Sequence, residues 1–252
     1  MIHNIERVRE QYKDLLDKMV ERGFAKAVCK ACCADDISYE WRCDCDENVF
    51  DELDMWMSCG ATRCCLGLNS DTEYVIKFQV DKDECDYCDR EASISRDAEK
   101  CGFGDFFAKS EPLFDYTFTY DNKDKMVKVY VMEWCYCDYD TVSDDSYRYH
   151  YSKFCEDNNL DASSDDSRDL FSDEEERRAS DDENSESNFG MIEYAKSTWG
   201  VIDEQFIHDL IDFMRDWEIN DLHAGNWGYK GNKLVMVDYG GYGDVAERHL
   251  YY

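Results

Sequence analysis

Three polar residues near the end of the chain have the types and spacing that phosphoryl transfer needs. Asp221 and Asn226 are separated by four residues, and Asp238 lies twelve positions after Asn226, directly behind an apolar run. Such chemistry needs one carboxylate to meet the proton of the attacking hydroxyl. It also needs an amide oxygen and a second carboxylate to hold Mg²⁺ on the phosphates of ATP. We therefore assign Asp221 to the hydroxyl, and Asn226 and Asp238 to the metal, as a hypothesis.

The segments that carry these residues resemble the protein-kinase-like superfamily. Residues 221–226, Asp-Leu-His-Ala-Gly-Asn, are similar to the catalytic loop of small or atypical kinases such as aminoglycoside and choline kinases. Residues 238–240, Asp-Tyr-Gly, are similar to the metal-binding Asp-Phe-Gly element. The resemblance covers about residues 55–243. It implies a two-lobed α+β fold, with a five-stranded antiparallel N-lobe sheet carrying one helix and a reduced, mostly helical C-lobe.

In and next to this loop, the sequence differs from that of ordinary protein kinases. Asn220 stands where those kinases have the Arg of His-Arg-Asp, and Ala224 replaces the usual Pro. His223 is typical of the small-molecule kinase branch, and the resemblance implies that it helps to neutralise the transferred phosphoryl group. The alternative is an imidazole that only packs the loop.

Residues 55–79 are expected to form three short strands that position the phosphates. Lys77 lies late in the third strand and resembles the lysine of Val-Ala-Ile-Lys, which reaches the α- and β-phosphates. Gly60 and Thr62 belong to a small-residue first turn whose backbone N–H groups can approach phosphates. This turn has fewer glycines than the family's loop. A helix is predicted over 83–100, and its Glu91 is expected to pair with Lys77.

A hairpin is predicted after the chain's only proline, Pro112. Aromatic and polar residues alternate up to residue 120, and an apolar run follows the Asp-Asn turn. This hairpin completes the expected sheet. Met132 and Glu133 then fall at the position that the resemblance gives to the hinge, where backbone groups would bind adenine and Met132 would back the pocket.

The remaining patterns predict helices and one irregular segment. Apolar residues recur at helical spacing over 5–20 and over 193–217, where a long buried helix would lead into the catalytic loop. Residues 156–188 are acidic and Ser-rich, and are predicted to lack regular structure. The predicted organisation is an N-terminal helical, Cys-containing extension over 1–54, the N-lobe and hinge over 55–138, and the reduced C-lobe over 139–252.

Cysteines open a second possibility near the N-terminus. Cys29, Cys32, Cys43 and Cys45 could supply four thiolates to zinc, although the second spacing is short and no histidine lies near. Free thiols are the favoured interpretation. The start of the chain has no signal-peptide pattern, so we expect a cytoplasmic protein whose 14 cysteines are mostly reduced.

The charge balance narrows the choice of partners. A formal net charge of −31 argues against binding bare nucleic acid or an anionic membrane, because both require clustered Lys and Arg. Hydrophobic residues make up 43% of the chain, which indicates a folded protein. No run approaches the roughly 20 apolar residues that span a bilayer. A basic protein is a candidate partner, besides ATP and an unidentified hydroxyl acceptor.

Two functions of other classes stay open. One is a kinase-shaped binding or regulatory module that has lost phosphoryl transfer. It is favoured by the small number of glycines in the first turn, the short stretch after Gly240 and the negative net charge. A weaker alternative is an acidic interaction protein that mimics nucleic acid and binds a basic protein without needing Asp238.

Overall fold

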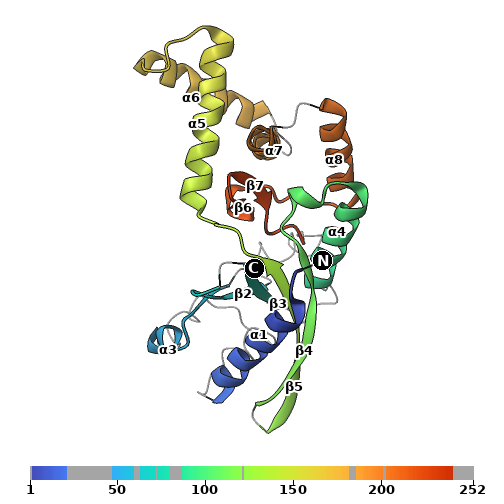
Figure 1. The fold of residues 1–252 in the computed structure, drawn as a ribbon. Coiled ribbons are helices and arrows are strands. Elements are labelled where there is room, and N and C mark those ends of the chain that lie inside the picture. Colours follow the sequence, from blue (N-terminus) through green and yellow to red (C-terminus); the bar gives the residue numbers. More distant parts are fainter. Residues whose placement is uncertain are drawn as a thin grey trace. The chain divides into compact units, whose positions relative to one another are not determined.

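The computed structural model divides into two compact units, Met1–Trp134 and Cys135–Tyr252. It describes residues 2–21, 47–59, 63–71, 73–79, 87–120, 122–181, 186–200 and 203–240. Figure 1 draws the helices and strands of both units. Among these residues, no helix combines the length and the apolar character that crossing a membrane requires.

The first unit contains a five-stranded antiparallel sheet with the order β1-β2-β3-β5-β4, which confirms the expected α+β class and sheet (Figure 1). Its strands are β1 (Met55–Cys59), β2 (Arg63–Leu68), β3 (Tyr74–Gln79), β4 (Ser110–Tyr120) and β5 (Lys123–Glu133). β-Branched and aromatic residues dominate β3 and β5, as their strand preference requires. The helical elements are α1 (Ile5–Met19), α3 (Glu47–Glu52), α4 (Tyr87–Cys101) and the 3₁₀ turn η3 (Gly104–Phe106).

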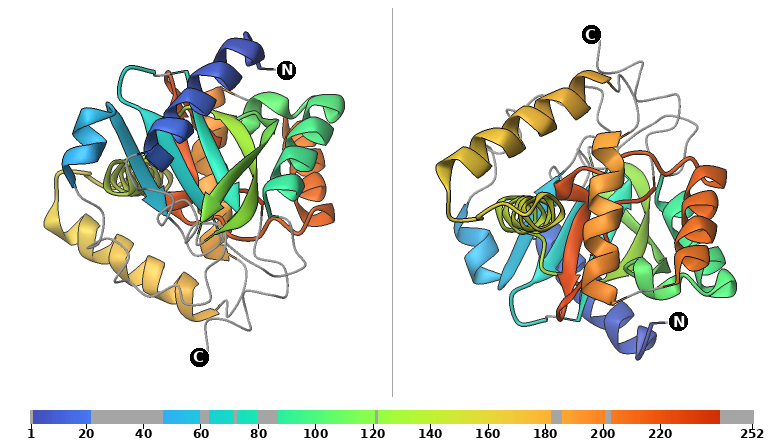
Figure 2. Two further views of the ribbon diagram at one scale, coloured as in Figure 1. Left: turned by 90° about the horizontal axis from the view of Figure 1, so that it is seen from below. Right: turned by 90° about the horizontal axis from the view of Figure 1, so that it is seen from above.

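Alternation along β5 gives the sheet two buried sides. Val127, Val129 and Val131 join the main apolar core together with the buried residues of α1. Tyr130 instead packs with Cys88 and Ala92 of α4. Helix α1 crosses the strands (Figure 2). Strand β5 contributes residues to both buried clusters. Strand β3 contributes residues to the main core and to a buried ion pair described below.

Helix α1 forms where the sequence predicts it, and its buried residues belong to the core of the first unit. Tyr12 of α1 is fully buried and donates a 2.7 Å hydrogen bond to the carbonyl of Tyr74 in β3. No pattern in the sequence says which surface an amphipathic helix covers. Here the helix contributes to the core of the first unit.

The second unit is mostly helical and contains one small hairpin. Its elements are α5 (Tyr139–Asn158), α6 (Asp165–Asp181), α7 (Glu186–Trp199), α8 (Glu204–Asp216), the 3₁₀ turn η4 (Ala224–Asn226), β6 (Trp227–Lys230) and β7 (Lys233–Met236). Tyr136 forms an antiparallel bridge with Tyr229 of β6, through backbone bonds of 2.8 and 2.9 Å. Residues 135–138 therefore belong to this unit, and not to the first unit as predicted.

Two expectations for this unit are wrong. Residues 165–181 of the acidic segment 156–188 are not irregular, because they form α6, whose Phe171 packs against Tyr147, Tyr151 and Phe154 of α5. The long helix predicted over 193–217 is two helices. Gly200 follows α7 with a left-handed φ of 62°, which ends the helix, and the side chain of Asp203 caps the start of α8.

Candidate functional site

In the first unit, the structure brings Lys77 and Glu91 together. The ammonium Nζ of Lys77 lies 3.1 and 3.2 Å from the two carboxylate oxygens of Glu91, and both residues are buried. Lys77 stands opposite Tyr130 in the β3–β5 register. A buried lysine keeps its charge only beside a compensating group, and Glu91 supplies that group.

Helix α4 presents Glu91 toward the sheet because its buried positions share one side. Cys88, Ala92 and Ser95 are buried together with Glu91, at helical spacings of three and four. The Ser95 hydroxyl accepts a 3.1 Å hydrogen bond from the backbone N–H of Ser110, which fastens α4 to the start of β4. The position of the glutamate is therefore set by both packing and a polar contact.

In the second unit, two side chains close the loop that carries Asp221. The amide Nδ2 of Asn226 donates a 2.8 Å hydrogen bond to the carbonyl oxygen of Asp221. The indole of Trp227 donates one of 3.1 Å to the carbonyl of Leu222. The loop residues Asp221 and Asn226 are therefore brought together, five positions apart in the chain.

The β6–β7 hairpin places Asp238 beside Asn226. Trp227 pairs with Met236 in the hairpin register, so the chain re-emerges next to Asn226. The Asn226 backbone carbonyl accepts the N–H of Val237 at 2.9 Å and that of Asp238 at 3.4 Å. The short turn between β6 and β7 therefore brings the backbone of Asp238 back beside that of Asn226.

One side of the Asn226 amide is engaged within the loop. Its Nδ2 is held by Asp221, whereas its Oδ1 accepts no hydrogen bond from the described residues. Amide and carboxylate oxygens are the donors that Mg²⁺ prefers. Asn226 and Asp238 are thus of the donor types that suit such an ion, and their backbones lie side by side. No group of three or more His, Cys, Asp and Glu side chains suited to a metal occurs in the described ranges.

His223 contacts Asp221 directly. Its Nδ1 accepts a 3.0 Å hydrogen bond from the N–H of Gly225, so the neutral ring carries its proton on Nε2. That Nε2 lies 3.5 Å from Oδ1 of Asp221. His223 is exposed, with 57% of its side chain accessible, and Asp221 is half-buried. The imidazole is therefore positioned beside the carboxylate and remains open to an incoming group.

The two hinge residues lie at the end of β5. Met132 is buried and pairs with Val75. The N–H of Glu133 donates to the carbonyl of Lys109 at 2.9 Å, and the N–H of Trp134 donates to that of Glu73 at 2.8 Å. Both N–H groups therefore already donate hydrogen bonds within the first unit.

Several predicted residues lie outside the described part of the chain. These are Gly60 and Thr62 of the glycine turn, and the candidate zinc ligands Cys29, Cys32, Cys43 and Cys45.

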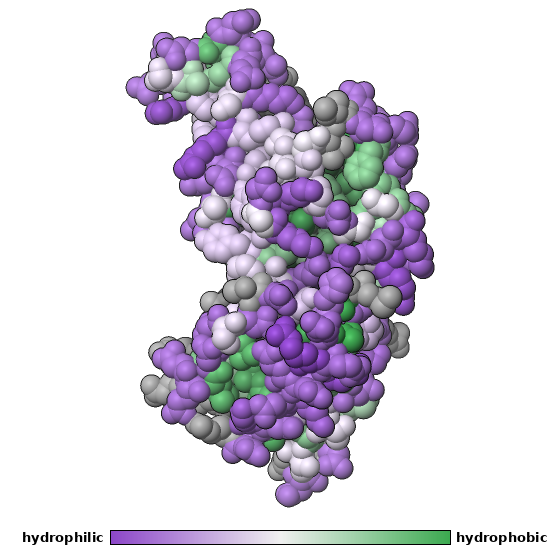
Figure 3. All heavy atoms as spheres, viewed as in Figure 1, coloured by the Kyte–Doolittle hydropathy of each residue, from purple (hydrophilic) through white to green (hydrophobic). Residues whose placement is uncertain are grey.

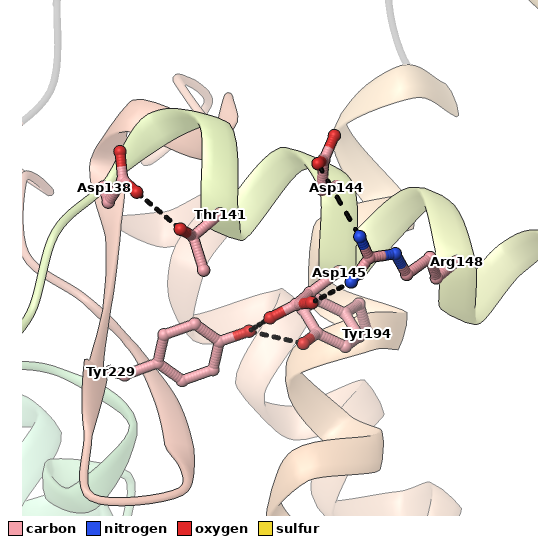
Figure 4. Close-up of polar contacts among 7 residues, drawn as sticks. All are labelled: Asp138, Thr141, Asp144, Asp145, Arg148, Tyr194 and Tyr229. Carbon is pink, nitrogen blue, oxygen red and sulfur yellow. Dashed lines mark hydrogen bonds and ion pairs between the residues drawn. The ribbon is translucent and has the colours of Figure 1, made fainter.

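Sequence reasoning missed the contacts that hold the hairpin. Tyr229 of β6 donates a 2.8 Å hydrogen bond to Asp145 of α5 and accepts one of 2.5 Å from Tyr194 of α7 (Figure 4). Burial, followed by these two hydrogen bonds, raises the pKa of Tyr229. Because Asp145 and Tyr229 are 84 positions apart, no local signal in the sequence could have paired them.

Helix α7 also holds the other strand of the hairpin. The indole of Trp199 donates to the carbonyl of Leu234 at 2.7 Å, and the hydroxyl of Thr198 accepts the Leu234 N–H at 3.0 Å. The Lys233 ammonium lies 4.0 Å from the centre of the Trp199 ring. Strand β6, which follows Asn226, and strand β7, which precedes Asp238, are therefore both held by hydrogen bonds to helices.

Comparisons of this chain with protein-family models, with curated proteins and with solved structures gave no match.

Proposed function

We propose that this chain is an ATP-dependent phosphotransferase of protein-kinase-like type, which moves the γ-phosphate of Mg-ATP to a hydroxyl acceptor. The observation that carries the proposal is the buried pair of Lys77 and Glu91, on a strand and a helix of the first unit. A lysine on the third strand held by a helical glutamate is the arrangement that orients ATP phosphates in protein kinases. The strand order and the position of α4 between β3 and β4 support the same proposal.

The second unit supplies the other roles. The carboxylate of Asp221 would accept the proton of the acceptor hydroxyl, with His223 beside it. Asn226, through Oδ1, and Asp238 would hold Mg²⁺, which when bound neutralises charge on the phosphates. The chain carries a net charge of −31, so a local cation is needed before a polyanion can bind. Lys77 supplies one such charge.

The proposal is tested by measuring γ-phosphate transfer to water or to added alcohols. Asp221→Asn and Asp238→Asn should each lower the rate by at least about 10²-fold, because each removes a charge that the reaction uses. Asp212→Asn is the matched control, since Asp212 is an exposed residue of α8 that pairs with Arg215. Equal rates in wild type and all three variants would contradict the assignment.

A thermal-shift measurement with Mg-ATP separates transfer from binding alone. Ligand at about 100 times its Kd should stabilise the protein by about 2.7 kcal/mol. Stabilisation without turnover would identify a nucleotide-binding module that lacks transfer. Absence of any stabilisation would reject both functions.

A further inference from the structure

Exposed apolar side chains concentrate on one part of the second unit. Five large hydrophobic residues are exposed in the described ranges, and four of them lie in or beside α5 and α6: Tyr136, Tyr139, Tyr147 and Leu170, at 43–58%. The fifth, Met126, belongs to the β4–β5 hairpin of the first unit. Clusters of this kind on a monomer commonly mark an interaction surface.

Two carboxylates and then two tyrosines follow one another along one side of α5. Asp140, Asp144, Tyr147 and Tyr151 follow the spacing i, i+4, i+7 and i+11, which places them on the same side. The rings of Tyr147 and Tyr151 stack at 6.2 Å with an interplanar angle of 12°. Phe171 of α6 packs edge-on against both rings, at 5.4 and 5.5 Å. The exposed Tyr147 ring is therefore held in place before any ligand arrives.

Helix α6 continues the pattern beside α5 (Figure 1). Asp166, Leu170 and Asp173 are exposed at the same helical spacing. Asp140, Asp166 and Asp173 make no hydrogen bond or ion pair with any residue that the structure describes. Residues 135–181 contain fifteen acidic and five basic side chains. This surface thus combines fixed aromatic rings with three carboxylates that make no ion pair, whereas Asp144 lies 3.9 Å from the guanidinium of Arg148.

We propose that these residues of α5 and α6, the α5–α6 face, bind a Lys- and Arg-rich segment of a partner polypeptide. Cations stack on tyrosine rings and pair with carboxylates, whereas nucleic acid would be repelled by the same carboxylates. Guanidinium groups satisfy both contacts at once, because they are planar and always charged.

The first residue of α5 lies next to the loop that carries the candidate catalytic residues. Tyr139 begins α5, and a Cβ built on Gly225 would lie 3.6 Å from Cδ2 of its ring. A polypeptide bound along α5 would therefore pass beside the loop of Asp221 and His223. The binding itself does not depend on phosphoryl transfer, and it can be measured without nucleotide.

The test uses the full chain and a fluorescein-labelled Arg-Ser repeat peptide, with anisotropy as the readout. The comparison peptide has citrulline in place of arginine, which keeps the shape and removes the charge. We expect binding of the arginine peptide alone, weakening as NaCl is raised. Tyr147→Ser should weaken it about two- to fivefold, whereas Tyr147→Phe should retain it because the ring remains.

Carboxylate variants separate a local site from general attraction to an acidic protein. Asp140→Asn with Asp144→Asn should weaken peptide binding by about two- to fivefold and flatten its salt dependence. Glu10→Gln with Asp115→Asn is the matched pair, since it removes two exposed charges from the first unit. Equal weakening by both pairs would overturn the proposal.

Two other outcomes would also overturn it. One is unchanged peptide binding in the Tyr147→Ser variant and the Asp140/Asp144 pair. The other is a self-associated chain that Tyr147→Ser converts to monomers in light scattering, since a second copy would then be the occupant.

Discussion

At the scale of single residues, the buried pair of Lys77 and Glu91 makes a prediction about stability. Lys77→Met leaves the Glu91 carboxylate buried without its cation, and should lower the free energy of unfolding by about 3–5 kcal/mol. The double variant Lys77→Met with Glu91→Leu should recover most of this loss, because no buried charge remains. Urea unfolding measures both.

The matched control for this prediction is Lys128→Met. Lys128 also pairs with a residue of α4, Asp89, at 2.9 Å, but about half of each side chain is exposed. Its loss should change the free energy of unfolding by at most about 1 kcal/mol. A double variant as unstable as Lys77→Met would show that the pair is not the source of the effect.

Tyr229 predicts a dependence of stability on alkaline pH. Its pKa is raised in the folded state, chiefly by burial, whereas a tyrosine in the unfolded chain has a pKa of about 10. The stability that the neutral phenol contributes is therefore present below about pH 10 and is lost as the pH rises toward the folded pKa. Tyr229→Phe should be less stable by about 1 kcal/mol at neutral pH and should lose less stability above pH 10.

The measurement for Tyr229 is urea unfolding of wild type and variant at neutral and alkaline pH. Tyr139→Phe, at an exposed tyrosine, serves as the control and should keep the wild-type profile. Parallel pH profiles for wild type and Tyr229→Phe would show that Tyr229 does not titrate with folding.

At the scale of elements, α7 predicts the behaviour of the β6–β7 hairpin. Thr198→Val keeps the shape of the side chain but leaves the buried N–H of Leu234 without its acceptor. We expect a loss of about 1–3 kcal/mol and faster hydrogen exchange at the Leu234 amide. Ser197→Ala is the control, since the Ser197 hydroxyl donates within α7 only. Unchanged exchange at Leu234 would contradict this role of α7.

The elements that the sequence predicted well are those with a strong period. Alternating aromatic and β-branched residues predicted β4 and β5, and the apolar spacing predicted α1. Helix α6 was missed because its composition is acidic, and its buried aromatic residue, Phe171, finds its partners on α5. The break at Gly200 was missed because apolar residues continue on both sides of it.

In the second unit, the candidate site was predictable where its residues are close in sequence. Asp221 and Asn226 meet within one loop, and a short hairpin returns Asp238 to Asn226. The occupied N–H groups of Glu133 and Trp134 follow from pairing with distant residues, which no local pattern specifies. The same holds for the hydrogen bonds of Tyr229.

At the scale of the whole molecule, charge predicts the effect of salt. Hydrophilic residues cover most of the face seen in Figure 3, and the net charge is −31. Mutual repulsion disfavours the compact state, and salt screens it. Raising NaCl should therefore raise the Tm, by about 2–4 °C for each kcal/mol of repulsion removed.

Choline chloride at the same ionic strength should raise the Tm as NaCl does if screening of charge repulsion is the cause. Sucrose at matched osmolality should not reproduce the dependence on ionic strength. A Tm that is flat or falls with either salt would contradict the prediction.

The division after Trp134 has a consequence for biosynthesis. Every strand of the five-stranded sheet, and both helices that cover it, are translated before Cys135. Domains generally fold as units during synthesis, the N-terminal one first. The ammonium–carboxylate contact of Lys77 and Glu91 can therefore form while the ribosome is still adding the residues of the Asp221 loop. If translation is arrested after α5, the five-stranded sheet of the nascent chain should already resist protease.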